Sequence, residues 1–233
     1  MRTLLFLLVL GFFVGNGPFD SASVAEPGHF SDQLPPPVPQ YDRTADALLY
    51  DSLRLVFGQN KVLPEGYELE ALRALSHYPE LREVPVSFIF RKNPVAHTSR
   101  PRNGRLLGRR DRRHYLVIIS TQVSEQLDPG RLPNLSYNAR IGVLGHELAH
   151  TVDYLDRSLG NLIGLGLRYA TDPQVVERWE RFTDSTAIRH NLGYQLRSWS
   201  EEVHPILEKA GRGQNYLRPE EITEFMRTLP AYQ

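Results

Sequence analysis

Apolar residues recur at helical spacing in two stretches of the first third of the chain. In the first stretch, residues 42–57, the apolar positions are Ala45, Leu48, Leu49, Leu53 and Val56. This period predicts one amphipathic helix, and Gly58 after it is suited to a C-cap. A second helix is expected over residues 65–77, because Pro79 follows and cannot continue it.

Two later stretches have the alternation or the β-branched content of strands. Residues 84–90 alternate apolar and polar side chains, and residues 114–120, HYLVIIS, form a run typical of a buried strand. Between them, Arg91 to Arg113 contains nine Lys or Arg residues and one acid, Asp111. We expect an exposed loop or hairpin there. The alternative to a merely solvated loop is a patch that attracts an anionic partner.

The second half of the chain is expected to be mainly helical. Residues 136–156 have the pattern of one long helix, and an Asp-Pro pair at the start of residues 172–192 predicts the N-cap and first position of another. The stretch between them, residues 158–167, is apolar and contains three glycines, so it predicts either a mobile flap or a packed connector. A proline opens a last short helix at residues 219–229.

The N-terminus has the pattern of a secretory signal peptide. One basic residue precedes the apolar run at 4–14, and small residues follow up to Ala25. A run of about 11 residues is too short to span a membrane, which takes about 20. We therefore expect residues 1–25 to be a signal peptide, 26–41 a Pro-rich surface arm and 42–233 one domain. The protein would be secreted or periplasmic, without a stable membrane span after cleavage. Retention of the signal segment as an anchor is the alternative.

Composition narrows the chemistry that the chain can perform. It has no cysteine, which excludes disulfides, thiolate metal ligands and a cysteine nucleophile. The formal net charge is +0, which offers no general attraction to nucleic acid, and the basic stretch lacks aromatic residues that would stack on bases. We therefore expect no nucleic-acid partner, and any metal site must use histidine and carboxylate ligands.

The strongest motif is HELAH at residues 146–150, an HExxH within the helix expected at 136–156. His146 and His150 lie on one face of such a helix, so both imidazoles can reach one zinc ion while Glu147 stands beside the water that the ion binds. Composition alone would place this pattern in the chain about 0.02 times. The alternative is a pair of helix histidines bonded to carboxylates.

A helical wheel of this stretch separates a packing face from a polar face. The apolar residues on the packing face are Ile141, Leu144, Leu148, Val152 and Leu155. The histidines and Glu147 lie opposite them. Gly142, Gly145 and Ala149 form a flank without bulk, which predicts the close approach of another segment.

Catalytic zinc normally has three protein ligands and one position for water, so a third ligand is required. The helix expected at 172–192 contains Glu180 and Asp184, which lie four residues apart and share a face. Glu180 is the candidate ligand, and Asp184 could accept a hydrogen bond from the other nitrogen of a histidine ligand. Glu177 is the nearest substitute for Glu180. The alternative for the pair is an ion-paired surface position.

These motifs resemble those of the gluzincin metallopeptidases, most nearly the HtpX and CAAX-endopeptidase-like group and its soluble periplasmic relatives. The similarity covers residues 144–196, from the HExxH through Glu-x-x-x-Asp to Ala187 and Gly193-Tyr194. It implies an α+β, zincin-like fold with a small sheet beside the HExxH helix and a predominantly helical C-terminal half. The roles it implies are zinc ligation by His146, His150 and Glu180, general-base catalysis by Glu147, and support of the site by Asp184. Thr183 stands where that group usually has alanine.

Metzincins place the third ligand differently, six residues after the second histidine, which is Asp156 here. That arrangement needs a glycine midway for a sharp turn, and Asp153 stands at that position. The one methionine after the motif, Met226, lies in an expected helix rather than in a turn. We therefore favour Glu180 over Asp156.

Together, the residues and the resemblance predict a zinc-dependent peptidase. Zinc would polarise the scissile carbonyl and lower the pKa of its bound water toward about 7, and Glu147 would move the proton to the leaving amine of a polypeptide substrate. A substrate strand would pair with a sheet edge, for which we expect residues 115–120. His190 and Tyr194 are candidate oxyanion donors that equally fit packing roles. The alternative function is a zinc-stabilised binding or chaperone-like protein without turnover.

Overall fold

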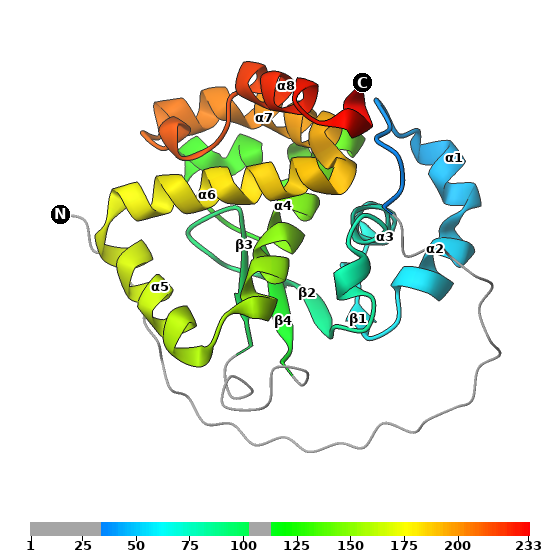
Figure 1. The fold of residues 1–233 in the computed structure, drawn as a ribbon, viewed down its shortest axis with the longest axis horizontal. Coiled ribbons are helices and arrows are strands. Elements are labelled where there is room, and N and C mark those ends of the chain that lie inside the picture. Colours follow the sequence, from blue (N-terminus) through cyan, green and yellow to red (C-terminus); the bar gives the residue numbers. More distant parts are fainter. Residues whose placement is uncertain (1–33, 103–112) are drawn as a thin grey trace.

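The computed structural model describes residues 34–102 and 113–233, and these residues form an α+β fold as expected (Figure 1). The expected signal peptide and the first part of the Pro-rich arm lie outside the described residues, as do residues 103–112 of the basic stretch. A small mixed sheet packs beside one central helix, and most of the C-terminal half is helical. None of the helices in residues 34–102 and 113–233 combines the length and the hydrophobicity that a membrane span requires.

In the described ranges the sheet has four strands, in the order β1-β2-β4-β3. Their bounds are Lys61–Val62 (β1), Val86–Arg91 (β2), His97–Pro101 (β3) and Tyr115–Ser120 (β4). β1, β2 and β4 are parallel, and β3 is antiparallel to β4. Both predicted strands are confirmed. The expectation that residues 115–120 form a sheet edge is wrong: all six are buried and lie between two neighbours, as their β-branched run itself favours.

The basic stretch is a hairpin in its described part, because β3 pairs antiparallel with β4. Arg91, Lys92 and Arg102 are exposed, as expected. Arg113 is not: it is 4% exposed, and its guanidinium donates to the carbonyl oxygens of Tyr154 (3.4 Å) and Arg157 (2.7 Å). These carbonyls end the HExxH helix, where backbone acceptors lack partners within the helix, so Arg113 contributes to capping its C-terminus.

Three α-helices precede β2 within residues 34–85. They are α1 (Arg43–Leu48), α2 (Tyr50–Phe57) and α3 (Glu68–Leu75), and α3 forms the crossover between the parallel strands β1 and β2. The prediction of a single helix over 42–57 is wrong in one respect: the helix breaks at Leu49. There the Leu49 N–H donates to Asp46 O in a tighter, 3-10-like turn. Asp46 is buried, where it binds Arg73 and the hydroxyl group of Tyr137 (2.7 Å). These contacts connect α1 to α3 and to Tyr137.

Five helices follow β4. They are α4 (Tyr137–Asp156), α5 (Leu159–Thr171), α6 (Pro173–Ala187), α7 (Gly193–Lys209) and α8 (Pro219–Arg227). Short 3-10 helices span Pro79–Leu81, Glu125–Gly130, Leu132–Asn134, Gly213–Asn215 and Pro230–Tyr232. The HExxH helix is confirmed, with the Ser136 side chain accepting from Ala139 N as its N-cap.

The stretch 158–167, predicted as a mobile flap or a packed connector, forms the first part of α5, which begins with the Ser158 hydroxyl oxygen accepting from Asn161 N (3.2 Å). Leu162 and Leu165 of this helix pack against the core, as expected of a packed connector. One prediction in this half is corrected. The helix predicted to run to residue 192 ends at Ala187, because Asn191 has a φ of 62° inside a wide turn and redirects the chain into α7.

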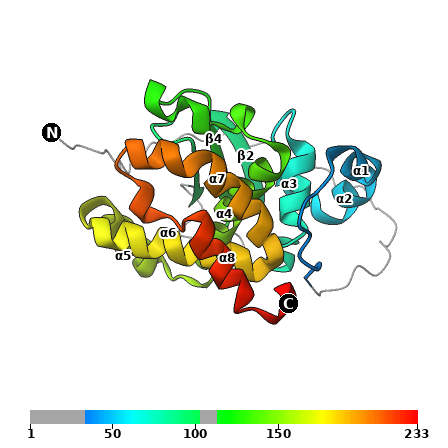
Figure 2. The same cartoon turned by 90° about the horizontal axis from the view of Figure 1, so that it is seen from above.

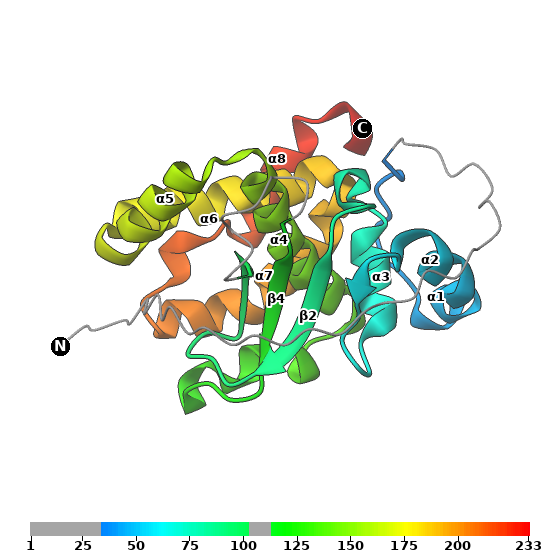
Figure 3. The ribbon, with the colours of Figure 1, turned by 90° about the horizontal axis from the view of Figure 1, so that it is seen from below.

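α4 lies at the centre of the molecule, with α3 and α7 packed against it and α6 crossing it (Figures 1 and 2). From below, β2 and β4 lie side by side next to α3 (Figure 3). The predicted small flank is where α7 approaches: a Cβ at Gly142 would lie 2.1 Å from the backbone oxygen of Gln195. At Gly145 it would lie 2.5 Å from the Leu192 side chain.

The described end of the Pro-rich arm, residues 34–41, also lies against this junction. Its backbone carbonyl oxygens accept hydrogen bonds from Asn191 Nδ2 at Pro35 (2.9 Å) and from Gln195 Nε2 at Val38 (2.9 Å). Side-chain amides thus bind a segment whose prolines cannot donate.

Candidate metal centre

α4 and α6 bring the predicted site residues together. The face of α4 that carries His146, Glu147 and His150 meets the face of α6 that carries Glu180 and Asp184, and each of these five residues is at most 5% exposed. One ligand atom from each histidine and one from Glu180 lie within 4.8 Å of one another. This is the one group of that kind in the described part of the chain, and it could hold a metal ion.

A partner on α6 holds the Nδ1 atom of each imidazole. His146 Nδ1 lies 2.8 Å from Asp184 Oδ1, and a carboxylate can only accept. His150 Nδ1 lies 3.1 Å from the hydroxyl oxygen of Thr183. That hydroxyl group donates its own proton to Trp179 O (2.9 Å), so its oxygen accepts from His150. Both Nδ1 atoms therefore donate, so in the neutral form of either imidazole the bare nitrogen is Nε2.

The two Nε2 atoms converge on one carboxylate oxygen. Glu180 Oε2 lies 3.1 Å from His146 Nε2 and 3.2 Å from His150 Nε2. Three acceptors at this spacing repel one another unless positive charge lies between them, as two additional protons or as one metal ion. Two imidazole nitrogens and a carboxylate oxygen are a suitable ligand set for zinc and related divalent ions. The other oxygen, Glu180 Oε1, accepts from the Tyr169 hydroxyl group (2.6 Å).

The electrostatics of the metal-free cluster follow from the same contacts. Burial alone would lower the pKa of His146, but its hydrogen bonds to Asp184 and Glu180 raise that pKa well above its ordinary value. Burial alone would raise the pKa of Glu180, but His150 and His146 hold it well below its ordinary value. The cluster therefore retains the anion and attracts a cation, and a bound metal ion would displace the protons.

Glu147 differs from the other acids of the site. Burial raises its pKa to about 7, against the opposing effect of the charges on His150 and His146. Its Oε2 atom is buried and has no hydrogen-bond partner among the described residues. A carboxyl group with a pKa near neutrality and an unused oxygen is suited to accept and return a proton.

Glu147 and His146 line a cavity of about 60 Å³, which His97, Trp199 and Tyr216 also line. A water molecule needs roughly 10–15 Å³ by the same measure, so the cavity has room for water beside Glu147. The site therefore has a carboxyl group, candidate ligands and solvent space in contact.

The alternative third ligand is not part of the cluster. Asp156 is exposed at the end of α4, and the helix continues through Asp153, where the metzincin arrangement needs a turn. Asp153 instead bonds to Arg157 and to Trp179 Nε1 (3.2 Å). Glu177 does not belong to the group of candidate ligands either.

The two candidate oxyanion donors lie in packing positions. His190 bonds to Thr186 O and to Glu80 Oε1 (2.9 Å) and stacks on Tyr78. Tyr194 packs against the ring of Tyr232. Neither side chain lines the cavity at Glu147.

Three supporting residues of the site were missed by sequence reasoning. Tyr169 comes from α5, which was not predicted to be a helix. Leu217 contributes its backbone N–H, which donates to Asp184 Oδ2 (2.8 Å). Thr183 was noted only as a departure from alanine. Its hydroxyl group lies one helical turn after Glu180 on the same helix, and that spacing was a usable signal.

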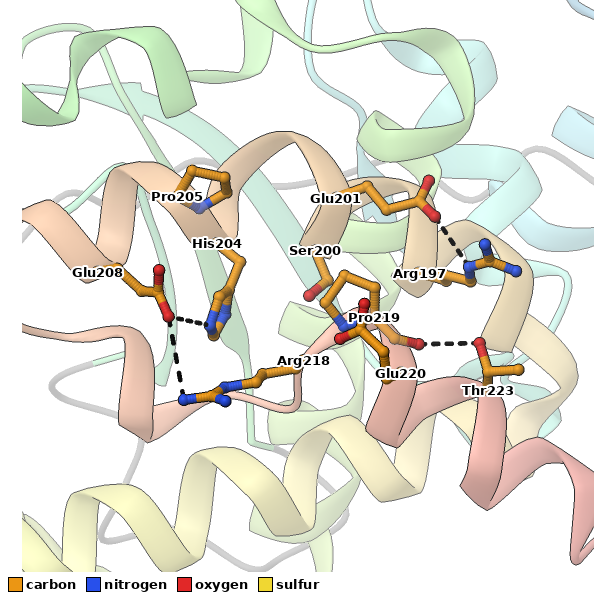
Figure 4. A pocket seen from close by; sticks show the side chains of 10 residues that line it. All are labelled: Arg197, Ser200, Glu201, His204, Pro205, Glu208, Arg218, Pro219, Glu220 and Thr223. Carbon is orange, nitrogen blue, oxygen red and sulfur yellow. Dashed lines mark hydrogen bonds and ion pairs between the residues drawn. The ribbon is translucent and has the colours of Figure 1, made fainter.

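A larger groove of about 380 Å³ lies between α7 and the start of α8 (Figure 4). No residue of the metal cluster lines it, and its charged side chains are largely paired with one another. Glu201 bonds to Arg197 (2.9 Å), and Glu208 lies 3.3 Å from His204 Nε2 and 4.0 Å from Arg218. Its greater size therefore does not make it the candidate site.

Comparisons of the chain with family models, with curated proteins and with solved structures found no match. The class of site is accordingly defined by its own residues: a buried His-His-Glu cluster with an adjacent carboxyl group of raised pKa.

Proposed function

We propose that this chain is a zinc-dependent peptidase with a zincin-like active site. The observation that carries the proposal is the convergence of three acceptor atoms, two imidazole Nε2 atoms and Glu180 Oε2, next to the unpartnered oxygen of Glu147. The resemblance of residues 144–196 to gluzincins supports it. The expected export agrees with a hydrolase that acts on polypeptides outside the cytoplasm.

Each residue has a distinct task in this proposal. His146, His150 and Glu180 would hold the ion, which when bound supplies a Lewis acid for the scissile carbonyl and a water of lowered pKa. Glu147 takes up the proton of the attacking water at one carboxylate oxygen and returns it to the nitrogen of the leaving amine. In the metal-free site, burial raises the pKa of this carboxyl group to about 7, so the group exchanges a proton near neutral pH. Asp184 orients the ring of His146.

β3 offers an edge for an extended substrate, in place of the strand first expected. Backbone groups of an antiparallel strand point alternately toward and away from the neighbouring strand. Ala96 O accepts from Ser120 N, so Thr98 and Arg100 also direct their backbone groups toward β4. The backbone groups of His97 and Ser99 therefore point away from β4, toward the open edge of the sheet. The Tyr154 hydroxyl group donates a hydrogen bond to the Ser99 carbonyl oxygen (3.1 Å), so this acceptor is already used. The available edge is therefore short, and it lies beside the cavity that His97 lines.

The test combines metal content with hydrolysis. Purified protein should bind about one zinc per chain and hydrolyse denatured casein, and Glu147→Gln should retain the zinc while hydrolysis falls by orders of magnitude. His146→Ala should lose both. Glu177→Gln is the matched control, because this α6 glutamate lies outside the cluster and should leave both unchanged.

Two results would contradict the proposal in different ways. Stoichiometric zinc without hydrolysis of casein or of a peptide library would favour a zinc-stabilised binding protein. Loss of zinc in Glu147→Gln equal to that in His146→Ala would show that Glu147 is a ligand rather than a base.

A further inference from the structure

We propose that the exposed face of α5 binds the same face of a second copy of this chain, with the two helices antiparallel. The face consists of Gly160, Ile163, Gly164 and Leu167, and we call it the outer face of α5. Neither zinc nor peptidase activity is required for this pairing, so it can be tested separately from the proposed function.

α5 is apolar on two sides but is covered on one side only. Leu162 and Leu165 pack against the core. On the other side, Ile163 is 48% exposed and Leu167 is 61% exposed. α5 contains no buried residue, and it lies at the periphery of the molecule in all three views (Figures 1, 2 and 3). A helix that is hydrophobic all round is normally buried, so the outer face indicates a partner.

The outer face has both projections and hollows. At 100° per residue, its four residues lie within an arc of about 100°, opposite the residues that pack on the core. A Cβ at Gly160 or at Gly164 would meet nothing within 4 Å, so the two glycines form a strip at which another helix can approach closely. Ile163 and Leu167 project beside this strip.

The spacing makes this face complementary to itself. An interface about a two-fold axis uses the same patch on both copies, so residue i meets residue j and residue j meets residue i. If two antiparallel α5 helices cross between Ile163 and Gly164, Leu167 of each copy lies opposite Gly160 of the other, because the two residues are equally far from the crossing point. A leucine side chain then fills the hollow at each Gly160, and apolar surface is removed from water at both ends.

The charges at the ends of α5 fit the same arrangement. Antiparallel helices place the C-terminal turn of one helix beside the N-terminal turn of the other, which also sets their dipoles in the favourable sense. Arg168, in the last turn of α5, is exposed, and so is Asp156, which comes shortly before the first turn. Arg168 of one copy therefore lies toward the end of α5 at which the other copy carries Asp156, and opposite charges approach at both ends.

A lipid surface fits the outer face less well than a second copy does. Helices that lie in a membrane interface have a polar face rich in lysine and arginine. α5 instead has one cation, Arg168, and its opposite face packs on the protein. A bilayer also makes no use of the hollows at Gly160 and Gly164, which only a matching side chain can fill.

A dimer held by α5 is expected to be weak. The helix has 13 residues, so its face is about 20 Å long and about 10 Å wide. A standard stable interface covers roughly 800 Å² on each partner, which is more than this face supplies. We therefore expect a transient dimer with a Kd of about 10–100 μM.

Sedimentation velocity of the exported chain, residues 26–233, measures association at protein concentrations from about 1 to about 500 μM. Gly160→Leu should weaken the dimer at least about 10-fold, because the new side chain fills the hollow, and Leu167→Ala should weaken it similarly, because the projection is lost. Combining both changes should restore much of the association, since position 160 then supplies the projection and position 167 the hollow. Leu55→Ala, at an exposed leucine of α2, is the control and should change nothing.

The absence of cysteine from the chain allows a direct test of the register. Chains with Gly160→Cys, mixed with chains that carry Leu167→Cys, should form a disulfide between the two different chains under mild oxidation, because the two positions lie opposite each other. Chains with Leu55→Cys should link to either of them at least about 10-fold more slowly. Mass spectrometry of the linked peptides identifies the positions that have joined.

Three results would overturn the pairing. They are a monomer at every concentration, a dimer that neither Gly160→Leu nor Leu167→Ala weakens, and equal linking of position 55 and position 167 to position 160. Binding of the monomer to vesicles of phosphatidylcholine and phosphatidylglycerol, made tighter by Gly160→Leu, would identify a membrane as the partner instead. Circular dichroism confirms that each variant is folded, and Leu167→Ala decides the question if Gly160→Leu is not.

The outcome for the pairing is distinguishable from the outcome for the proposed function. A dimer that contains no zinc and hydrolyses no peptide would retain the pairing and contradict the peptidase. Hydrolysis by a chain that stays monomeric at every concentration would contradict the pairing and leave the peptidase standing.

Discussion

Replacing Glu147 by glutamine should make the metal-free protein more stable at alkaline pH. Burial raises the pKa of this carboxyl group to about 7, whereas in the unfolded chain it has its ordinary value of 4.5. The unfolded chain therefore releases the proton first, and the free energy of unfolding falls as pH rises between these two values. Glutamine has nearly the same shape and carries no charge, so the variant escapes this loss.

The size of the effect follows from the two pKa values. A rise from 4.5 to about 7 corresponds to about 3 kcal/mol of stability lost by pH 8, of which about 1 kcal/mol is already lost at pH 5. The variant should thus gain about 2 kcal/mol on the wild type between pH 5 and pH 8. The other acids and histidines of the cluster are present in both proteins, so the difference between them reports on Glu147.

Urea unfolding followed by circular dichroism, at pH 5, 6, 7 and 8 after removal of metal by a chelator, measures this difference. Glu177→Gln is the control, and its curve should run parallel to that of the wild type. If the Glu147→Gln and wild-type stabilities also run parallel from pH 5 to pH 8, Glu147 is not held in a state that resists ionisation. Glu147 would then be ionised throughout this range and unsuited to return a proton near neutral pH.

Three further changes test the ligand set and the packing around it. Glu180→Ala should lose zinc during dialysis against a weak chelator, because only two ligands remain. Asp156→Ala should retain zinc, and the reverse result in elemental analysis would refute the ligand set. Tyr169→Phe should lower zinc affinity about 10- to 100-fold in chelator competition, because Glu180 loses its hydrogen bond at Oε1. An unchanged affinity would show that Tyr169 does not support the ligand. Gly142→Ala should lower the free energy of unfolding by about 1–3 kcal/mol, because its new methyl group clashes with α7. Gly164→Ala should raise that free energy by about 1 kcal/mol, because its methyl group meets nothing within 4 Å. Equal effects of the two changes in urea unfolding would contradict the close approach of α7 to α4.

Local signals predicted the centre of this fold well. The HExxH helix was predicted with its small flank, because both depend on residues three or four positions apart in one segment. The grouping of Glu180 and Asp184 with the histidines was also predicted, because spacing on two helices limits which side chains can share one metal ion. The two β-branched or alternating strands were found for the same reason.

Long-range features were not predictable in this way. α5 was missed because three glycines weaken its helical pattern, whereas the Ser158 cap and packing on α6 outweigh their cost. The central position of β4 depends on a strand that returns antiparallel on its far side, which no periodicity encodes. Leu217 acts through a backbone N–H that every residue except proline has, so nothing in its side chain marks it.

The hydrogen bond from Leu217 N to Asp184 Oδ2 joins two positions 33 residues apart and sets an order of events during synthesis. A chain grows from its N-terminus, so both helices that carry the candidate ligands leave the ribosome before the residue that fixes Asp184 behind His146. A nascent chain that ends after α6 has all three candidate ligands but lacks the contact that holds one of them in place. We therefore expect a metal ion to bind tightly only after residues 216–218 have folded back onto α6, and not in a chain that ends after α6.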